Sequence, residues 1–204
     1  MKNILKISLY FVFSAAFFLG CQEDETDNVS FVTTYPVISI EGPQIYTVPV
    51  GTSFADPGVE ARVGTEPVAV STSGEVDTSE PGVYALTYQA TNTDGFSRTA
   101  SRQVVVYDPA TNVIDLSGQY RRAATGAIAT VTKIGPSTYT INDAAGFGAE
   151  PFLNVTFVHT QGTELVIPLQ TASSGITVET IPGSRFTTAT GFRWQLSASS
   201  FYGT

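Results

Sequence analysis

The sequence predicts an all-β protein with two antiparallel β-domains in tandem. Short runs rich in Val, Ile, Thr and Tyr recur between Gly, Pro, Asn and Asp residues, which is the pattern of strands separated by turns. Few stretches show the 3.6-residue apolar period of an amphipathic helix. The 204 residues include one cysteine and one histidine, which excludes an internal disulfide and argues against a zinc site. The stability of both domains must therefore come from packing.

The first 20 residues have the features of a secretory signal peptide. Lys2 and Lys6 give a positively charged start, and residues 7–19 form a mostly apolar run. This run is shorter than the roughly 20 apolar residues that a transmembrane helix needs, and Gly20 supplies the small residue required for cleavage. We therefore expect residues 1–20 to be removed on export.

Cys21, the only cysteine, follows this segment in the sequence Phe18-Leu19-Gly20-Cys21. The segment resembles a bacterial lipobox, although Phe18 is an unusual occupant of the first position. In a lipobox the cysteine thiol takes a diacylglycerol and becomes the new N-terminus. The alternative is an ordinary signal peptide that ends at the same place. We expect lipidation of Cys21, and because each buried methylene contributes about 0.8 kcal/mol, two or three acyl chains would anchor the protein to a membrane.

Residues 21–34 are expected to form an acidic tether. Residues 22–28 carry four carboxylates and no apolar side chain, a composition typical of a solvated, extended linker. An acidic cluster directly after a lipidated cysteine resembles the surface-export signal of Bacteroidetes lipoproteins, which implies a place on the outer face of the outer membrane. Loss of Lys2 and Lys6 changes the formal net charge from −8 to about −10, so nucleic acid is not an expected partner.

Residues 35–108 are expected to form a small β-sandwich with Greek-key wiring. Its two longest alternating runs, 82–91 and 97–106, are joined by Asn92-Thr93-Asp94-Gly95. This is a hairpin turn, because Asp-Gly tolerates positive φ. Further strands are predicted at 37–40, 45–49, 59–63 and 68–71.

The strings GTSFADPGVEA, SGEVDTSEPGVYALTYQATNTDGFS and ASRQVVVYD resemble the bacterial immunoglobulin-like domains of surface proteins. The resemblance covers residues 35–108 and implies an immunoglobulin-like β-sandwich. Within it, Tyr84, Leu86 and Tyr88 share parity along one strand, and we expect them to face the core.

Four carboxylates of this first domain could converge on calcium, since hard cations prefer oxygen ligands. We expect the prolines and glycines beside these carboxylates in the sequence to form turns. We predict no metal site and no other cofactor. The four are Asp56, Glu60, Asp77 and Asp94.

Residues 109–113 predict a linker, because Pro109 stops strand pairing and the residues after it are small or polar. Residues 114–204 are expected to form a second antiparallel β-sheet or barrel. The run TVTKIGPSTYTINDAAGFG predicts a hairpin followed by a glycine-rich loop. Predicted strands lie at 118–122, 127–134, 138–143, 153–160, 164–167, 175–180 and 192–197.

This hairpin, together with the opening DLSGQYRR, resembles the C-terminal β-domain of certain Bacteroidetes surface lipoproteins. The resemblance implies an association with systems that capture glycans, although the function of that family is itself poorly defined. The chain ends ten residues after Trp194, so we expect either a truncated chain or a smaller last sheet than the family has.

The sequence does not favour an enzyme. His159 lies in a strand-like run without a Gly-x-Ser-x-Gly elbow, and we expect a neutral, structural histidine. A glycosidase needs two carboxylates about 5 to 10 Å apart across a cleft. The acidic residues of the second domain are near turns or on solvated strand faces, and no pair stands out; they are Asp115, Asp143, Glu150, Glu164 and Glu179.

Ligand binding is the more favoured function, because exposed aromatic rings can cover the apolar faces of sugars while nearby polar groups fix the hydroxyls. Each candidate ring could instead belong to the core. Trp194 alternates with Phe192 and Leu196, which favours the core, whereas Phe147 is flanked by glycines, which favours exposure. The candidate ligand-binding residues are Phe147, Trp194, Tyr202, Tyr139, Asn142 and Asp143.

Two functions follow from these patterns. The first is an accessory surface lipoprotein that binds a polysaccharide or oligosaccharide, with the immunoglobulin-like domain as a spacer. The second is a structural or adhesive module that docks to an outer-membrane protein such as a transporter component. A glycan site predicts a concave groove with an exposed aromatic ring, whereas protein docking predicts a flat apolar patch or a free edge strand.

Overall fold

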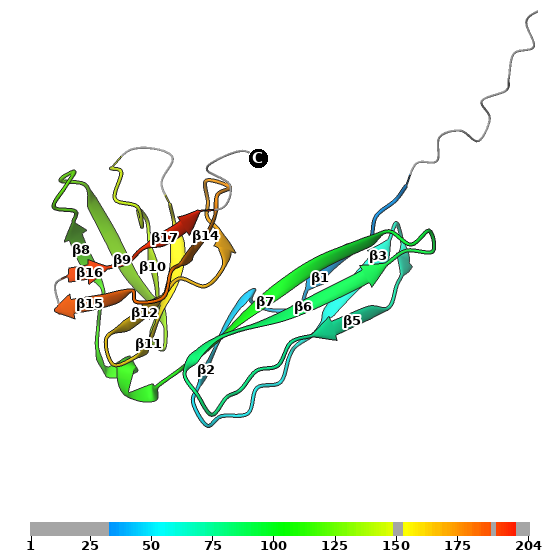
Figure 1. Ribbon diagram of the computed structural model, residues 1–204, viewed down its shortest axis with the longest axis horizontal. Coiled ribbons are helices and arrows are strands. Elements are labelled where there is room, and N and C mark those ends of the chain that lie inside the picture. Colours follow the sequence, from blue (N-terminus) through cyan, green and yellow to red (C-terminus); the bar gives the residue numbers. More distant parts are fainter. Residues whose placement is uncertain (1–32, 149–152, 189–190, 199–204) are drawn as a thin grey trace, which may run out of the picture. The chain divides into compact units, whose positions relative to one another are not determined.

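The computed structural model describes residues 33–148, 153–188 and 191–198, and their regular secondary structure is β-strand apart from one short 3-10 helix (Figure 1). The all-β prediction is confirmed. The predicted signal peptide, the lipidation site Cys21, nearly all of the tether and the candidate Tyr202 lie outside the described residues. Within the described part of the chain, no helix has the length and apolar character needed to cross a bilayer.

Two sheets form the first domain, which spans β1 to β7. One sheet has the order β1 (Val37–Ile40), β3 (Val59–Val63), β4 (Glu66–Pro67); the other has the order β2 (Ile45–Pro49), β7 (Ser97–Tyr107), β6 (Gly82–Thr91), β5 (Val70–Ser73). β6 and β7 form the long hairpin predicted from Asp94-Gly95, with pairs running from Gly82↔Val106 to Thr91↔Ser97. β2 pairs with β7 in parallel, whereas the other ladders of the domain are antiparallel.

The strand predicted at 68–71 overlaps β5 at residues 70 and 71, but the prediction missed β4. Residues 66–73 contain two short strands, β4 and β5, which belong to different sheets. β4 ends at Pro67, which has no backbone N–H to donate to a ladder. The Val68 N–H still donates to the Ala61 carbonyl oxygen of β3 at 2.9 Å, and the chain then crosses to the other sheet, where β5 begins at Val70.

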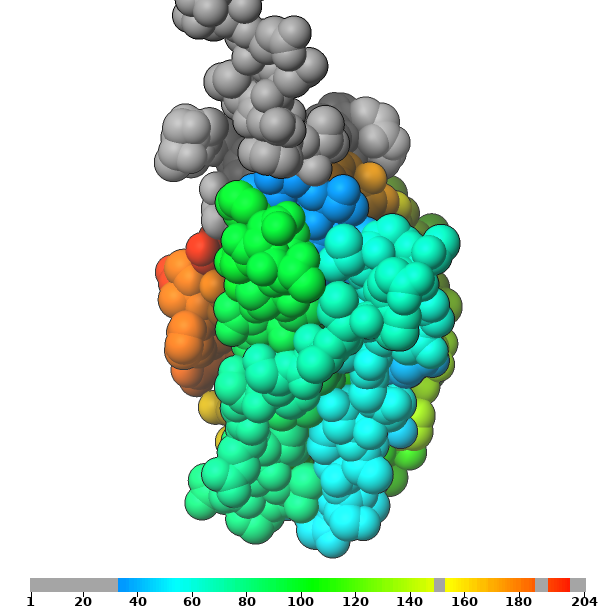
Figure 2. Space-filling model, turned by 90° about the vertical axis from the view of Figure 1, so that its right-hand side faces the viewer, coloured from blue at the N-terminus to red at the C-terminus, as the bar shows by residue number. Residues whose placement is uncertain are grey.

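The core of the first domain surrounds the β6–β7 hairpin. Tyr88 and Leu86 are buried there, as their parity predicts, together with Val104 and Val48, while Tyr84 is only partly buried. On its visible face the domain shows closely packed cyan and green segments with only shallow grooves between them (Figure 2).

Arg102 in β7 is a fully buried charge at the centre of this first domain. Its Nε lies 3.0 Å from Asp56 Oδ1, and its Nη2 donates to the carbonyl oxygen of Gly58 at 3.2 Å. The guanidinium also donates to the carbonyl oxygens of Pro43 and Glu41. Asp56 is therefore held by Arg102 in a structural role.

A seven-stranded antiparallel sheet dominates the second domain. Its order is β16 (Gly191–Arg193), β15 (Arg185–Thr188), β12 (Glu164–Val166), β11 (Val155–Gln161), β10 (Thr138–Ile141), β9 (Ile128–Gly135), β8 (Gly118–Arg121). A smaller sheet has the order β13 (Gln170–Thr171), β14 (Thr177–Thr180), β17 (Leu196–Ala198).

The seven-stranded sheet is rolled towards a barrel. β8 and β16 are its two edge strands, yet the ring centroids of Tyr120 in β8 and Phe192 in β16 are 4.1 Å apart. Figure 1 shows these two strands approaching each other on the same side of the domain. Twisted sheets close in this way when their strands tilt and stagger, and here side chains rather than a hydrogen-bonded ladder bridge the two edges.

The strand predicted at 192–197 is interrupted at Trp194 and Gln195. Residues before the break belong to β16 in the large sheet, and residues after it belong to β17 in the small sheet. The alternation of Phe192, Trp194 and Leu196 continues through the break, so the sequence pattern alone does not reveal it. Trp194 thus lies where the chain passes from one sheet to the other.

The linker predicted at 109–113 is a short 3-10 helix, η2 (Pro109–Val113). Asp108 caps it, because its carboxylate accepts a hydrogen bond from the Ala110 N–H at 2.9 Å. Thr111 is buried and its Oγ1 lies 2.7 Å from Ser137 Oγ. This connection is therefore a structured element, not an extended one.

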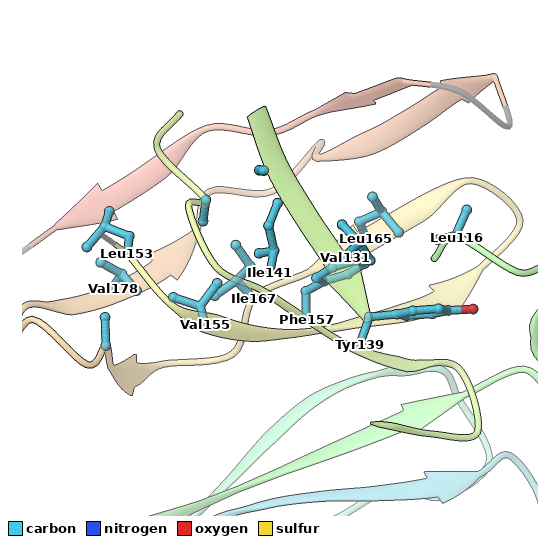
Figure 3. Packing of buried hydrophobic residues seen from close by; sticks show 13 residues of the cluster. Leu116, Val131, Tyr139, Ile141, Leu153, Val155, Phe157, Leu165, Ile167 and Val178 are labelled. Atoms are coloured by element: carbon cyan, nitrogen blue, oxygen red, sulfur yellow. The ribbon is translucent and has the colours of Figure 1, made fainter. Parts of the chain in front are cut away.

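The core of the second domain fills the space between its two sheets. Figure 3 shows Val131, Phe157 and Leu165 clustered between the strands, with Tyr139 beside them. The rings of Tyr139 and Phe157 are fully buried and stacked, with centroids 5.2 Å apart. The same cluster is completed by partly buried rings of Tyr120, Phe192 and Trp194 at one end.

Candidate functional site

A cavity of about 590 Å³ lies where the two edges of the large sheet approach each other. We call it the seam cavity. Its lining comes from residues 120–123, 143–147 and 191–194, with Ala127, Ala129, Ile141 and Leu196 completing it. This volume is within the usual range for small-ligand sites, which are concave and mostly apolar with a few polar groups.

Aromatic side chains form one part of the seam cavity. The rings of Phe192 and Trp194 are stacked, with centroids 5.5 Å apart and planes 7° apart. The Trp194 Nε1 donates to the carbonyl oxygen of Ala144 at 2.9 Å, which fixes the indole. Tyr120 donates its hydroxyl to the Leu116 carbonyl oxygen at 2.8 Å, and burial raises the pKa of this phenol, so it stays a neutral donor. The rings are therefore held in place before any ligand arrives.

The loop after β10 presents the exposed ring of the site. Asp143 is buried, and its carboxylate accepts hydrogen bonds from the Phe147 N–H at 3.1 Å and the Gly148 N–H at 2.8 Å. Gly146 has φ +63°, and a Cβ there would lie 2.5 Å from Arg122 Cδ, so the turn requires glycine. The Phe147 ring beyond it is 49% exposed.

The same loop is tied to the turn that follows β8. The Arg122 guanidinium donates to the carbonyl oxygens of Ala145 and Gly146, and the Thr125 hydroxyl donates to the Gly146 carbonyl oxygen at 2.8 Å. With the Asp143 and Trp194 contacts, these bonds anchor the loop on three sides. The backbone that carries the exposed Phe147 side chain at the edge of the cavity is thus fixed.

The structure brings together three of the predicted site residues, since Phe147, Trp194 and Asp143 all line the seam cavity. Trp194 is partly buried and packs on the core, so it belongs to the core and to the cavity at once. Asn142 lies outside the lining, and its Oδ1 accepts from the Thr130 N–H at 2.7 Å. Tyr202 is outside the described residues.

Tyr139 is not a surface contact, contrary to the sequence prediction. Its side chain is fully buried, and its hydroxyl donates to the Ile114 carbonyl oxygen at 2.7 Å. The residue alternates with Ile141 along β10, on the face that packs against the core. Along a strand, residues that pack in the core and residues that face an internal ligand site occupy the same alternate positions. Alternation in the sequence therefore does not distinguish a core tyrosine from a ligand-binding one.

Sequence reasoning missed Tyr120 and Phe192 as members of the site. They lie more than 70 residues apart in the chain and meet only because the sheet rolls up. The cavity also gathers Arg121, Arg122 and Arg193. The string DLSGQYRR contains two of these arginines, but nothing local to it indicates that they line one cavity with residues of the other edge strand.

His159 lies apart from the seam cavity. It is fully buried in β11, and its Nε2 is 2.7 Å from the Gly162 carbonyl oxygen. Burial is the main cause that lowers its pKa below the usual value. Within the described ranges, no group of three or more His, Cys, Asp or Glu side chains is arranged to hold a metal ion.

A second cavity, of about 540 Å³, has a different character. Most of its lining comes from residues 164–169 and 179–184, and no aromatic ring is among its lining residues. Apolar side chains and the two carboxylates of Glu164 and Glu179 are among the residues that line it. The seam cavity is therefore the better candidate for a ligand that stacks on rings.

Comparison with known proteins identifies the first domain. Residues 38–106 match the family model described as the Ig-like domain of bacterial surface proteins. The first domain is Ig-like. The predicted immunoglobulin-like fold is thereby confirmed for the strands from β1 to β7, and the matched residues lie inside the range 35–108 expected from the sequence.

Two solved structures are similar to this chain. One is the crystal structure of a lipoprotein from Bacteroides thetaiotaomicron, with 25% identity and a TM-score of 0.38, covering 80% of this chain and 94% of that one. The other contains the CBM51-2 and INT domains of ZmpB from Clostridium perfringens, in complex with GlcNAc, with 16% identity and a TM-score of 0.31, covering 73% of this chain and 30% of that one. A search of curated proteins finds no match.

Proposed function

We propose that the protein is a non-catalytic, lipid-anchored protein of the bacterial cell surface, whose second β-domain binds a glycan in the seam cavity. The observation that carries the proposal is the concave site with a half-exposed Phe147 on a loop whose backbone is hydrogen-bonded in place. The stacked pair of Phe192 and Trp194 adds apolar area to it. A sugar ring that lies on Phe147 would gain contact with little loss of side-chain entropy.

The choice between glycan binding and protein docking rests on the shape of the surface. A glycan site predicts a concave groove with an exposed aromatic ring, and the seam cavity has both. Other large exposed apolar side chains lie in small groups: Tyr35 and Phe96 pack edge to face in the first domain, and Leu169 and Ile181 line the second cavity. Neither group combines a concave site with polar groups that suit a sugar as the seam cavity does.

The chemistry of the cavity supports a non-catalytic role. Among the described residues that line the cavity, Asp143 is the one carboxylate, and both of its oxygens already accept backbone N–H groups. Glycoside hydrolysis needs two carboxyl groups facing each other across the scissile bond. A braced, buried Asp143 serves to shape the loop instead.

The anchor and the first domain complete the proposal. Cys21 after an apolar segment is the expected lipidation site, and the acidic residues after it favour export to the outer face of the outer membrane. The Ig-like domain, which belongs to a type found in bacterial surface proteins, would then act as a spacer between the anchor and the glycan-binding domain. A transporter component of the outer membrane is the partner to which captured glycan would pass.

Affinity gel electrophoresis tests the proposal. The mature protein, produced with Cys21→Ser so that it is not acylated, would be run through gels containing plant, host or microbial polysaccharides. We expect at least one polysaccharide to retard the protein, and Phe147→Ala to weaken this retardation about tenfold or more, because the ring supplies much of the contact area.

Phe96→Ala is the matched control, since Phe96 is 40% exposed and lies in the β6–β7 turn of the Ig-like domain. It should be retarded like the parent protein. Absence of retardation by every polysaccharide, or equal loss in both variants, would contradict the proposed function.

A further inference from the structure

Positive charge is concentrated around the seam cavity of an acidic protein. The chain has a formal net charge of −8 at pH 7. Five basic residues follow η2, namely Arg121, Arg122, Lys133, Arg185 and Arg193. Three of these five, Arg121, Arg122 and Arg193, line the cavity.

The cavity arginines are not neutralised by carboxylates in the described part of the chain. The ion pairs between described residues are Arg62–Glu60 and Arg102–Asp56, both in the Ig-like domain. Asp143 lines the same cavity, but its oxygens accept N–H groups of the 143–148 loop. The formal charge of the described lining residues is therefore positive, with three arginines and one carboxylate.

The three arginines have different roles. Arg122 holds the 143–148 loop through two carbonyl oxygens, so it serves the architecture of the site. Arg121 donates from Nη1 to the Gly126 carbonyl oxygen at 3.1 Å, and a guanidinium has five N–H donors in all. Arg121 and Arg193 are both exposed. They follow the core-facing rings Tyr120 and Phe192 along their strands, so their side chains leave the outer face of the sheet and reach a ligand from the mouth of the cavity.

Arg193 also lies opposite a like charge. In the ladder between β15 and β16 it is the register partner of Arg185, which is exposed as well. Like charges directly opposite each other on one face of a sheet are destabilising. An anion bound beside Arg193 would offset this repulsion.

We infer that the ligand of the seam cavity is an acidic glycan, whose uronate carboxylates or sulfate esters pair with Arg121 and Arg193 while a sugar ring stacks on Phe147. The inference rests on the proposed function and names the class of glycan. Planar guanidinium groups match carboxylate and sulfate oxygens with paired hydrogen bonds. Because the protein as a whole repels polyanions, such binding requires this local site.

Isothermal titration calorimetry with matched ligands tests the inference on the mature Cys21→Ser protein. The uronate arm compares polygalacturonate with its carboxyl-reduced form, and the sulfate arm compares chondroitin sulfate with its desulfated form. Polyglutamate serves as an acidic polymer without sugar, and a neutral polysaccharide panel runs beside them. We expect binding in one arm that is lost when the carboxyl or sulfate group is removed.

Variants then locate the contact. Arg193→Gln and Arg121→Gln should each weaken binding of the acidic glycan about tenfold or more, as expected for loss of a charge-assisted hydrogen bond. Arg98→Gln removes an exposed arginine from β7 of the Ig-like domain and should leave the affinity unchanged. Thermal unfolding of each variant confirms that the fold is retained.

The outcomes separate this inference from the proposed function. Binding of neutral glycans alone, with Phe147→Ala defective and Arg193→Gln normal, would overturn the acidic ligand and keep the glycan site. Equal binding of polyglutamate, or acidic binding that neither arginine variant weakens, would also overturn it. No binding of any glycan would overturn the proposed function itself.

Discussion

At the scale of single residues, Arg102 shows how one side chain can organise a small domain without a disulfide. Its guanidinium is fully buried and bonds to Asp56 and to backbone carbonyl oxygens of residues 41, 43 and 58. Tyr88 joins the network, since its hydroxyl donates to Asp56 Oδ2 at 2.9 Å and accepts from Arg102 Nε at 3.1 Å. The network ties β6 and β7 to the segments around β1 and β3.

Replacing Arg102 should therefore be costly for the Ig-like domain. Arg102→Met keeps the length of the side chain but leaves Asp56 and several carbonyl oxygens without their donor. We expect the free energy of unfolding to fall by about 3 to 5 kcal/mol, measured by urea denaturation. Arg98→Gln, on the exposed part of the same strand, should change it by less than about 0.5 kcal/mol. A loss below about 1 kcal/mol for Arg102→Met would contradict the structural role.

His159 makes stability depend on pH. Burial lowers its pKa in the folded protein, so below about pH 6.5 the unfolded chain binds a proton that the folded chain resists. Stability should consequently fall as the pH drops from 7.5 towards the lowered pKa, and it should be insensitive to this group above pH 7.5. As the only histidine in the chain, His159 is the one side chain whose ordinary pKa lies in this interval.

Urea midpoints measured between pH 5 and pH 7.5 test this dependence. The parent protein should lose stability over this interval, whereas His159→Gln, which keeps an N–H donor near the Gly162 carbonyl oxygen, should show a flatter profile. Parallel profiles for the two proteins would show that His159 does not titrate as described.

At the scale of elements, alternation and turn chemistry predicted most strands of the fold. The strands 37–40, 45–49, 59–63 and 82–91 lie where the sequence placed them, because Gly, Pro and Asp-Gly mark their ends. The elements that sequence reasoning missed are set by partners far away in the chain. β13 has only two residues, which is too short to form a sequence pattern. At the break between β16 and β17, the chain leaves its pairing with β15 and pairs with β14 of the other sheet.

The same distinction applies to the candidate site. Exposure of Phe147 could be predicted, because two flanking glycines place the ring in a tight loop. Burial of Arg102 could not, since arginine is rarely buried and the surrounding run of β7 looks like an ordinary strand. The contact between Tyr120 and Phe192 arises only when the edges of a rolled sheet meet, and no local pattern carries that information.

At the scale of the whole molecule, the two β-domains differ in what they offer a ligand. The Ig-like domain is braced by Arg102 and shows closely packed segments with shallow grooves on its visible face (Figure 2). The second domain leaves the edges of its sheet incompletely closed, and the seam cavity lies between them. Rings and arginines line this opening, and for this reason we propose it as the glycan-binding site of a mostly acidic protein.

The single tryptophan of the chain provides the most direct test, because Trp194 lines the seam cavity. Its fluorescence would be followed while a polysaccharide that retards the protein is titrated into the mature Cys21→Ser protein. We predict a saturable change in Trp194 emission whose midpoint matches the affinity from calorimetry, and which Phe147→Ala abolishes at the same ligand concentrations. Binding measured by calorimetry with no change in Trp194 emission, and with Phe147→Ala binding as tightly as the parent, would place the glycan elsewhere and contradict the seam cavity as the binding site.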